Sequence, residues 1–388
     1  MFNKFIFNLS YSKLLVFYFL LLLFFSFVIF PSHDIIFYYY PWSTSLQLSY
    51  YDGPPFIAYV IRLSTMLFGH NIFALNIWGV IIAAMTCFYI VRLGELLHNI
   101  KFGYIAAFFW LVYPFSTTRF IFVTLNYDCL DNVFSIIVLY YFLRYLKFNT
   151  YLDLYFTGIA SGFLLLSKYT GIVLLLGILM LIVTNKNNRQ LLRNKNFYGA
   201  IACCLVIFLP VIIWNYQHDW VSFKYQLTTH SWSTGGYNAA SSGWTGVLFY
   251  IFTDILGVIH TLLLLLIYTL YCSRAKASVV VSEKTHQLIN SLWIVFAVYL
   301  IFWLLMSYSS HIAMNYLLAP DSIFIILVVF HLYRDRHSLL LKCVAILLFA
   351  ISIVMLVDRA FIKVPEKWDL QQFQQLAPPI SDTRFFIK

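Results

Sequence analysis

The sequence predicts an all-α integral membrane protein. Hydrophobic residues make up 62% of the 388 residues and charged residues only 10%, whereas about a quarter of a soluble domain is charged. A bilayer core about 30 Å thick needs roughly 20 apolar residues per helical crossing, and the apolar runs here suffice for about eleven helices. No basic cluster lies on a polar domain, so we attribute the net charge of +10 to membrane loops and not to nucleic-acid binding.

The first apolar run, 14–30, follows Lys4 and Lys13 and is predicted to be an uncleaved anchor with a cytoplasmic N-terminus. The later runs are 72–91, 103–123, 128–146, 152–184, 198–215, 245–271, 289–306, 312–330 and 338–357. As one helix, 152–184 would extend about 50 Å, too long for one crossing. Basic residues flank both of its ends, so we predict two crossings with a turn at 167–171, which places Lys168 at the outer face.

The alternation of basic and non-basic loops predicts the domain organisation. Residues 1–357 form one transmembrane domain, and its outer first loop, about 32–71, carries juxtamembrane helices. Residues 358–388 form a short tail that is predicted to be periplasmic.

Several classes of site lack support in the sequence. The six cysteines have neither zinc-ligand spacing nor the pattern of a disulfide framework, so we interpret them as packing residues. No Walker loop, GxGxxG motif after a strand, or HExxH motif occurs. We therefore expect no certain cofactor.

Acidic residues are few, and most of them are predicted to lie at the outer face of the membrane. The carboxylates assigned to the outer face are Asp34, Asp52, Asp128, Asp131, Asp219 and Asp321. Asp254 and His260 lie deeper, and such residues are costly in lipid unless they face a polar cavity. A cavity with carboxylates, Lys168 and many aromatics suits transfer from a lipid-linked phosphate donor. A carboxylate would accept the proton of the attacking hydroxyl, and a cation would stabilise the departing phosphate.

Ordered sequence blocks carry a family resemblance. The blocks are 50–59, 67–69, 126–128 (Asn-Tyr-Asp), 166–171 (Leu-Ser-Lys-Tyr-Thr-Gly), 209–215 and 218–223 (His-Asp-Trp-Val-Ser-Phe). They resemble the bacterial branch of the protein O-mannosyltransferase superfamily, which includes lipid A aminoarabinose transferases and RgtA/B/C/D-like glycosyltransferases. The resemblance implies a GT-C fold, an undecaprenyl- or dolichyl-phosphate sugar donor, and inverting transfer on the periplasmic side of the bacterial inner membrane.

The resemblance also implies site residues. Asp34 is the nearest match to the acidic pair of the family's first loop and is our candidate base, although Ile35 stands where the family has a second acid. Asp128 matches the second family carboxylate, with helix capping as the alternative. For Asp131 we expect capping. Lys168 occupies the position of a family lysine and is our candidate contact to the donor phosphate.

The remaining candidates carry alternatives. Arg119 and His311 are further candidates for phosphate contact. Asp52 is either a substrate contact or a turn residue before two prolines. His218 is expected to be mainly structural, with donor or acceptor contact as the alternative. Whether Asp34 and Asp128 hold a divalent cation is left open.

The predicted activity is that of a hexosyl or pentosyl transferase acting on lipopolysaccharide, lipid A or another envelope glycan, and less readily on protein. Its partners would be the lipid-linked donor, the acceptor and the bilayer. The alternatives are a lipid or polysaccharide transporter (flippase), which would place ionisable residues at paired helix breaks near the midplane, and a non-catalytic family member.

Overall fold

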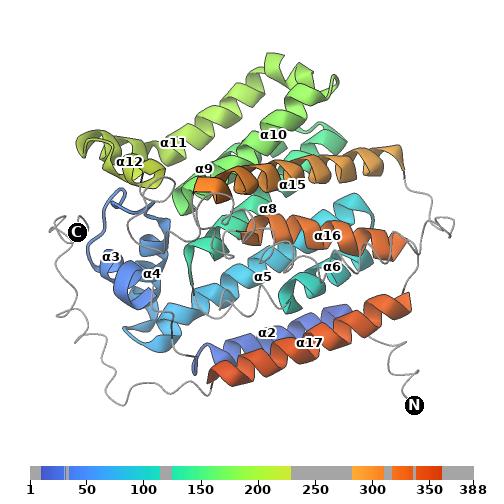
Figure 1. Cartoon of the computed structure of the whole chain (residues 1–388), viewed down its shortest axis with the longest axis horizontal. Coiled ribbons are helices and arrows are strands. Elements are labelled where there is room, and N and C mark those ends of the chain that lie inside the picture. The colour runs from blue at the N-terminus through green and yellow to red at the C-terminus, as the bar shows by residue number, and fades with distance from the viewer. Residues whose placement is uncertain are drawn as a thin grey trace.

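The protein is an α-helical bundle, as predicted. The computed structural model describes residues 10–29, 31, 35–113, 125–228, 282–309, 317–334 and 338–360. Throughout these ranges every regular element is helical (Figure 1). The predicted run 245–271, with Asp254 and His260, lies outside them. The number of eleven crossings therefore stays a prediction.

The helices follow one another along the chain with short connections. The N-terminal half contains α2 (Tyr11–Phe25), the π-helix η1 (Ile35–Tyr39), α3 (Tyr40–Thr44), α4 (Phe56–Phe68), α5 (Ile72–Leu97), α6 (Ile100–Val112), α8 (Tyr127–Phe148) and α9 (Tyr151–Ser167). The C-terminal half contains the 3-10 helix η2 (Tyr169–Gly171), α10 (Ile172–Thr184), the 3-10 helix η3 (Asn188–Arg193), α11 (Lys195–Gln217), α12 (Val221–Thr228), α15 (Glu283–Ser309), α16 (Leu318–Arg334) and α17 (Ser338–Ala360).

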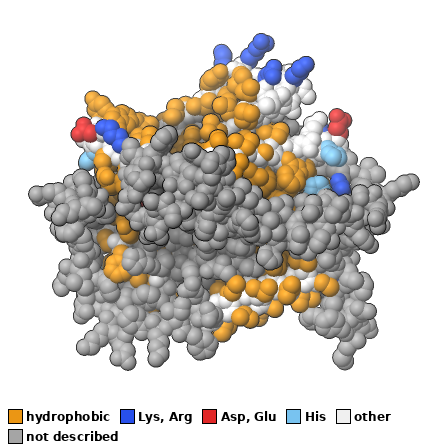
Figure 2. Space-filling view, viewed as in Figure 1, with side chains coloured by type: hydrophobic (Ala, Val, Ile, Leu, Met, Phe, Trp, Pro, Cys, Tyr) orange, Lys and Arg blue, Asp and Glu red, His pale blue; other side chains and the backbone are white. Residues whose placement is uncertain are grey.

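Four of the described helices, α5, α8, α11 and α15, are long and apolar enough to cross a membrane. Of these, α8 is the most enclosed by protein and α11 the least. Orange hydrophobic side chains cover much of the visible described surface (Figure 2). This distribution fits a bundle whose outer faces meet lipid while α8 lies inside the protein.

Asparagine side chains define the starts of three helices. Asn71, Asn99 and Asn126 precede α5, α6 and α8, and each side-chain oxygen accepts a hydrogen bond of 2.9 Å from the backbone N–H three residues later. This N-cap satisfies a donor that the first helical turn would otherwise leave free.

Helix contacts establish the path of the chain. α8 and α9 are antiparallel, because Asp128 pairs with Lys168 at one end and Arg144 with Asp153 at the other. α9 and α11 are parallel, because the backbone of Gly158 lies against Ala200 and that of Gly162 against Ile207. The chain must therefore return between them. The break from Ser167 to Ile172 lies at the predicted turn, and α10 is the returning helix.

The two ends of the bundle differ in charge. The connection between α10 and α11 carries the exposed side chains Lys186, Arg189, Arg193 and Lys195. Figure 2 shows a group of blue Lys and Arg side chains at its top edge, where Figure 1 places this connection. Lys168 lies at the other end of α10. The structure thus separates a basic end from the end that holds the Asp128–Lys168 pair.

Replacement of Gly158 tests the close contact between α9 and α11. A Cβ at this position would lie 2.1 Å from the carbonyl oxygen of Ala200, a backbone atom that cannot move aside. We expect Gly158→Val to destabilise the protein by about 1–3 kcal/mol or more, since overpacking displaces backbone. Thermal unfolding in detergent would measure this. Ile159→Phe, which enlarges an exposed neighbour on the same helix, should leave the midpoint nearly unchanged.

Candidate functional site

A cluster of aromatic rings from the first loop packs against the start of α8. Trp42 and Tyr50 stack with ring centroids 4.3 Å apart and an interplanar angle of 6°. Tyr39 meets Tyr127 edge-on at 4.6 Å. A Cβ at Gly53 would lie 2.9 Å from the Tyr127 hydroxyl oxygen, so glycine permits this approach. The rings hold the loop against the helix that carries Asp128.

Tyr50 fixes the shape of this loop. Its hydroxyl donates to the Trp42 carbonyl oxygen over 2.8 Å and accepts from the Gln47 backbone N–H over 3.2 Å. Burial raises the pKa of the Tyr50 hydroxyl above its usual range, so the group stays protonated and able to donate. Backbone bonds between Tyr50 and Gly53 close a tight turn, and Asp52 lies within it.

The segment after α11 closes the loop from the other side. The indole N–H of Trp214 donates to Gln47 Oε1 over 3.0 Å. His218 stacks on Trp214 with centroids 4.0 Å apart, and its Nδ1 lies 2.7 Å from the Trp214 carbonyl oxygen. His218 therefore helps to shape the end of α11, and its contact with a donor or acceptor stays a prediction.

α12 adds polar contacts to the same loop. Asp219 and Trp220 adopt positive φ values of 55° and 59°, which turn the chain sharply from α11 into α12. Gln226 Nε2 then donates to the Asp52 carbonyl oxygen over 2.5 Å. The hydroxyl of Tyr169 lies 3.0 Å from Ser222 Oγ and 3.1 Å from Ser49 Oγ. Tyr169 thus joins the first loop, η2 and α12.

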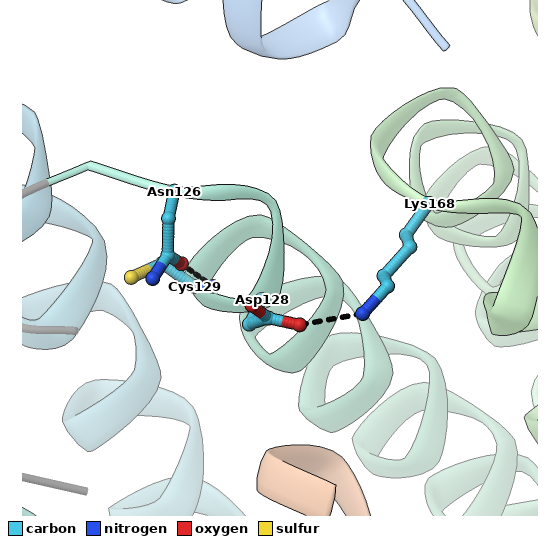
Figure 3. A network of polar contacts seen from close by, with 4 residues as sticks. All are labelled: Asn126, Asp128, Cys129 and Lys168. Atoms are coloured by element: carbon cyan, nitrogen blue, oxygen red, sulfur yellow. Dashed lines mark hydrogen bonds and ion pairs between the residues drawn. The ribbon is translucent and has the colours of Figure 1, made fainter. Parts of the chain in front are cut away.

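An ion pair lies beneath this assembly. Lys168 Nζ donates to Asp128 Oδ1 over 2.6 Å (Figure 3). The Asp128 side chain is 8% exposed and that of Lys168 is 16% exposed, so both charges are largely withdrawn from solvent. Asp128 comes from the first turn of α8, and Lys168 lies at the break between α9 and η2. The two residues predicted to share the outer face are therefore in direct contact.

The start of α8 corrects one prediction. Asn126 is the N-cap, as Figure 3 shows by its bond to the N–H of Cys129. Asp131 therefore does not cap the helix. It lies in the next turn and is only 8% exposed. Its Oδ1 has no hydrogen-bond partner among the described residues. The expectation of capping was wrong because the helix begins at Tyr127, too far before Asp131 for its side chain to reach the free N–H groups.

The other predicted site residues divide into two groups. Asp52 lies close enough to Tyr127 and Tyr169, the chain neighbours of Asp128 and Lys168, to interact electrostatically with both. Its turn and its proximity to the ion pair leave both interpretations of Asp52 in place. The predicted residues Asp34, Arg119 and His311 lie outside the described residues.

Ile35 is described, and it begins η1 with its side chain fully buried in the main hydrophobic core. The position at which the family resemblance leads one to expect a second acid thus contributes to packing here. In the described part of the chain, no group of three His, Cys, Asp or Glu side chains could hold a metal ion. A cation between Asp34 and Asp128 stays an open prediction.

Several residues of the site were not predicted individually. Gln47, Ser49, Ser222 and Gln226 connect segments that are 53 to 174 residues apart in their hydrogen bonds. Neutral polar side chains of this kind carry no charge or metal-ligand pattern. Tyr169 lies in the block 166–171 that carries the family resemblance, and its position beside Lys168 was the signal that could have identified it.

The ion pair can be tested by a double-mutant cycle. Lys168→Met should destabilise the protein by about 3–5 kcal/mol, because it removes the Lys168 cation from its ion pair with the buried Asp128 carboxylate. Asp128→Asn should also destabilise it. The double variant should lose less than the sum, with a coupling of about 1–3 kcal/mol. Unfolding midpoints in detergent would measure the cycle, and strict additivity would contradict a direct interaction.

The helix start gives a second test. Asn126→Ala should lower stability by about 0.5–2 kcal/mol through loss of the N-cap, whereas Asn126→Ser should retain most of it. Thermal unfolding of the two variants side by side would check this. Equal losses would mean that the side-chain oxygen of Asn126 contributes nothing as a cap.

Comparison with known proteins gives a consistent result. The family model described as dolichyl-phosphate-mannose-protein mannosyltransferase matches residues 52–214. The lipid A galacturonosyltransferase RgtD of Rhizobium johnstonii is 26% identical over 201 residues, which are 52% of this chain and 42% of that protein. The chain thus aligns with less than half of this curated relative.

Solved structures share the fold. ArnT from Cupriavidus metallidurans bound to undecaprenyl phosphate superposes with a TM-score of 0.60 at 14% identity, covering 90% of this chain and 71% of ArnT. Its apo state gives a TM-score of 0.59 at 14% identity, with 95% and 69% covered. The chain therefore has the GT-C membrane fold that the resemblance from sequence implied, and its sequence is similar over part of its length to glycosyltransferases of that fold.

Proposed function

We propose that the protein is an inverting glycosyltransferase that moves a sugar from a polyprenyl-phosphate donor to a periplasmic envelope acceptor, with lipid A or lipopolysaccharide as the leading class. The observation that carries the proposal is the Asp128–Lys168 pair, held under the first loop at a break between two apolar helices. It provides a largely buried cation at one end of a lipid-facing bundle.

In the proposed reaction, an acceptor hydroxyl oxygen attacks the anomeric carbon of the donor sugar. The bond between that carbon and the phosphate oxygen breaks, and its electron pair stays on the phosphate. Lys168 would stabilise the negative charge that develops there. Asp34 is our candidate to take the hydroxyl proton. Attack from the face opposite the phosphate inverts the anomeric centre.

The surroundings of Lys168 suit a donor with a long apolar tail. Large hydrophobic side chains follow the turn along α10 at helical spacing and are exposed, namely Ile172, Leu176, Leu179 and Val183. A phosphate at Lys168 would leave its polyprenyl chain against this apolar stripe, within the bilayer. The fold shared with ArnT, which was solved with bound undecaprenyl phosphate, supports this class of donor.

The charge distribution supports the proposed orientation. The basic connection between α10 and α11 lies opposite the ion pair, and short basic loops favour the cytoplasmic side. We therefore assign the ion-pair end to the periplasm of a bacterial inner membrane. The RgtD relative, a lipid A galacturonosyltransferase by name, supports an envelope glycolipid as acceptor. The sugar, hexose or pentose, is left open.

Activity of the purified protein tests the proposal. In detergent, with polyprenyl-phosphate sugars and lipid A, we expect a glycosylated product detectable by mass spectrometry. Lys168→Ala should reduce its rate by about 100- to 1,000-fold, since it removes a group that stabilises the developing charge. Asp34→Asn should reduce it as well. Detergent abolishes the two membrane compartments, so a transporter would give no covalent product.

A matched control lies at the basic end. Arg92→Gln removes one cation from an exposed pair with Glu95 and should leave the rate close to that of the wild type. In cells, deletion of the gene should remove one modification of the envelope glycolipids, and the wild-type gene should restore it. An unchanged glycolipid profile on deletion, or full activity of Lys168→Ala, would contradict the proposal.

A further inference from the structure

A group of buried polar atoms lies next to the ion pair, further along α8 and on the neighbouring helix α15. Asp131, Asn132 and Ser135 on α8 and Tyr299 on α15 are 8%, 1%, 0% and 3% exposed. Each has a side-chain polar atom without a hydrogen-bond partner within the described ranges: Asp131 Oδ1, Asn132 Nδ2, Ser135 Oγ and Tyr299 Oη. Buried polar groups are usually paired, so four such atoms in one region require an explanation.

These side chains belong to one place. Residues 128, 131, 132 and 135 share one face of α8, because they are three and four positions apart. Asp131 interacts electrostatically with both Lys168 and Asp128, and Tyr299 interacts electrostatically with Asp131. The hydroxyls of Tyr299 and Ser135 also lie close enough to interact with each other, but the contact does not have the geometry of a full hydrogen bond. α8, α15 and α16 pack against one another around this face. A polar stripe therefore runs from the ion pair into the bundle.

The amide of Asn132 belongs to the same stripe. Ser322 Oγ on α16 accepts from the Trp110 indole N–H over 2.7 Å and lies 2.7 Å from the Asn132 amide oxygen and 2.8 Å from the Leu318 carbonyl oxygen. Ser322 thereby engages one polar atom of that amide. The other, Nδ2, has no hydrogen-bond partner among the described residues, and it requires one from another source.

We propose that these four side chains line a buried water site that is continuous with the outer end of the bundle through the Asp128–Lys168 pair. A buried water molecule typically needs two to four polar partners, and apolar cavities stay dry. The stripe provides a carboxylate, an amide and two hydroxyls. One carboxylate with neutral groups satisfies the hydrogen bonds of water and does not amount to a cluster for a divalent metal.

The role of this water rests on the proposed function. If Lys168 turns toward a donor phosphate, Asp128 loses the cation of its ion pair, and weakening the charge pairing of a buried carboxylate is costly. Water one helical turn below can hydrate Asp128 when Lys168 moves. The water site would therefore make it possible for a buried lysine to change partners.

Chemical labelling tests the water site without donor or turnover. Ser135→Cys should react with a small water-soluble methanethiosulfonate at least about tenfold faster than Val133→Cys, a buried position on the opposite face of α8. Peptide mass spectrometry would locate the label, so the native cysteines can stay. Adding Asp131→Leu to Ser135→Cys should slow the reaction, whereas adding Asp131→Asn should slow it less. Equal rates for Ser135→Cys and Val133→Cys would overturn the proposal.

A measurement on the wild-type protein guards against misfolded variants. In pulsed hydroxyl-radical footprinting, bound water promotes oxidation of adjacent side chains, so Tyr299 should be oxidised faster than Phe296, which is buried one turn away on α15. Equal protection would overturn the water site. Polyprenyl phosphate should bind more weakly to Asp131→Leu than to Asp131→Asn. If both variants bound polyprenyl phosphate equally while the labelling showed a hydrated site, only the role of the water in the movement of Lys168 would be rejected. If the site were hydrated but the protein had no activity, only the proposed glycosyltransferase activity would be rejected.

Discussion

The contact between Asp128 and Lys168 is the interaction on which the site depends. It joins the first turn of α8 to the break that separates α9 from α10. A lysine in an apolar run is costly in lipid, and a carboxylate on the most enclosed candidate span is costly in a protein interior. The attraction between the two charges offsets part of the cost of burying each of them. The ion pair of the site therefore also stabilises the packing of α8 against α9.

The polar layer above the ion pair solves a different problem. A loop of two short helices and a tight turn must keep one conformation beside a membrane. Aromatic stacking of Trp42 on Tyr50 provides contact area, and hydrogen bonds from Trp214 and Gln226 connect the loop to α11 and α12. The His218-Asp219-Trp220 segment contributes through its stacking and its positive φ angles. In the described structure, this segment forms the sharp turn between α11 and α12.

The sequence was sufficient for the fold class and for part of the site. Apolar run lengths and flanking charges predicted the helices and the turn at Lys168, because the cost of charge in lipid allows few alternatives. Local sequence patterns did not reveal the hydrogen bond between Gln47 and Trp214, 167 residues away. A neutral amide can pair with any donor that the packing of the helices places beside it, so its own sequence position does not indicate its partner. Asp131 was misassigned for a third reason: Asn126 and Asp131 are both good capping residues, and only the observed first turn distinguishes them.

The antiparallel pairing of α8 with α9 has a further electrostatic consequence. Aligned peptide dipoles give the start of a helix a partial positive charge and its end a partial negative charge. Asp128 lies in the first turn of α8, and Lys168 directly follows the last residue of α9. The start of α8 therefore favours the Asp128 charge, and the end of α9 favours the Lys168 charge, although η2 begins at the residue after Lys168 and partly offsets the field of α9. When the two side chains separate, the ends of α8 and α9 would still attract the Asp128 carboxylate and the Lys168 ammonium group.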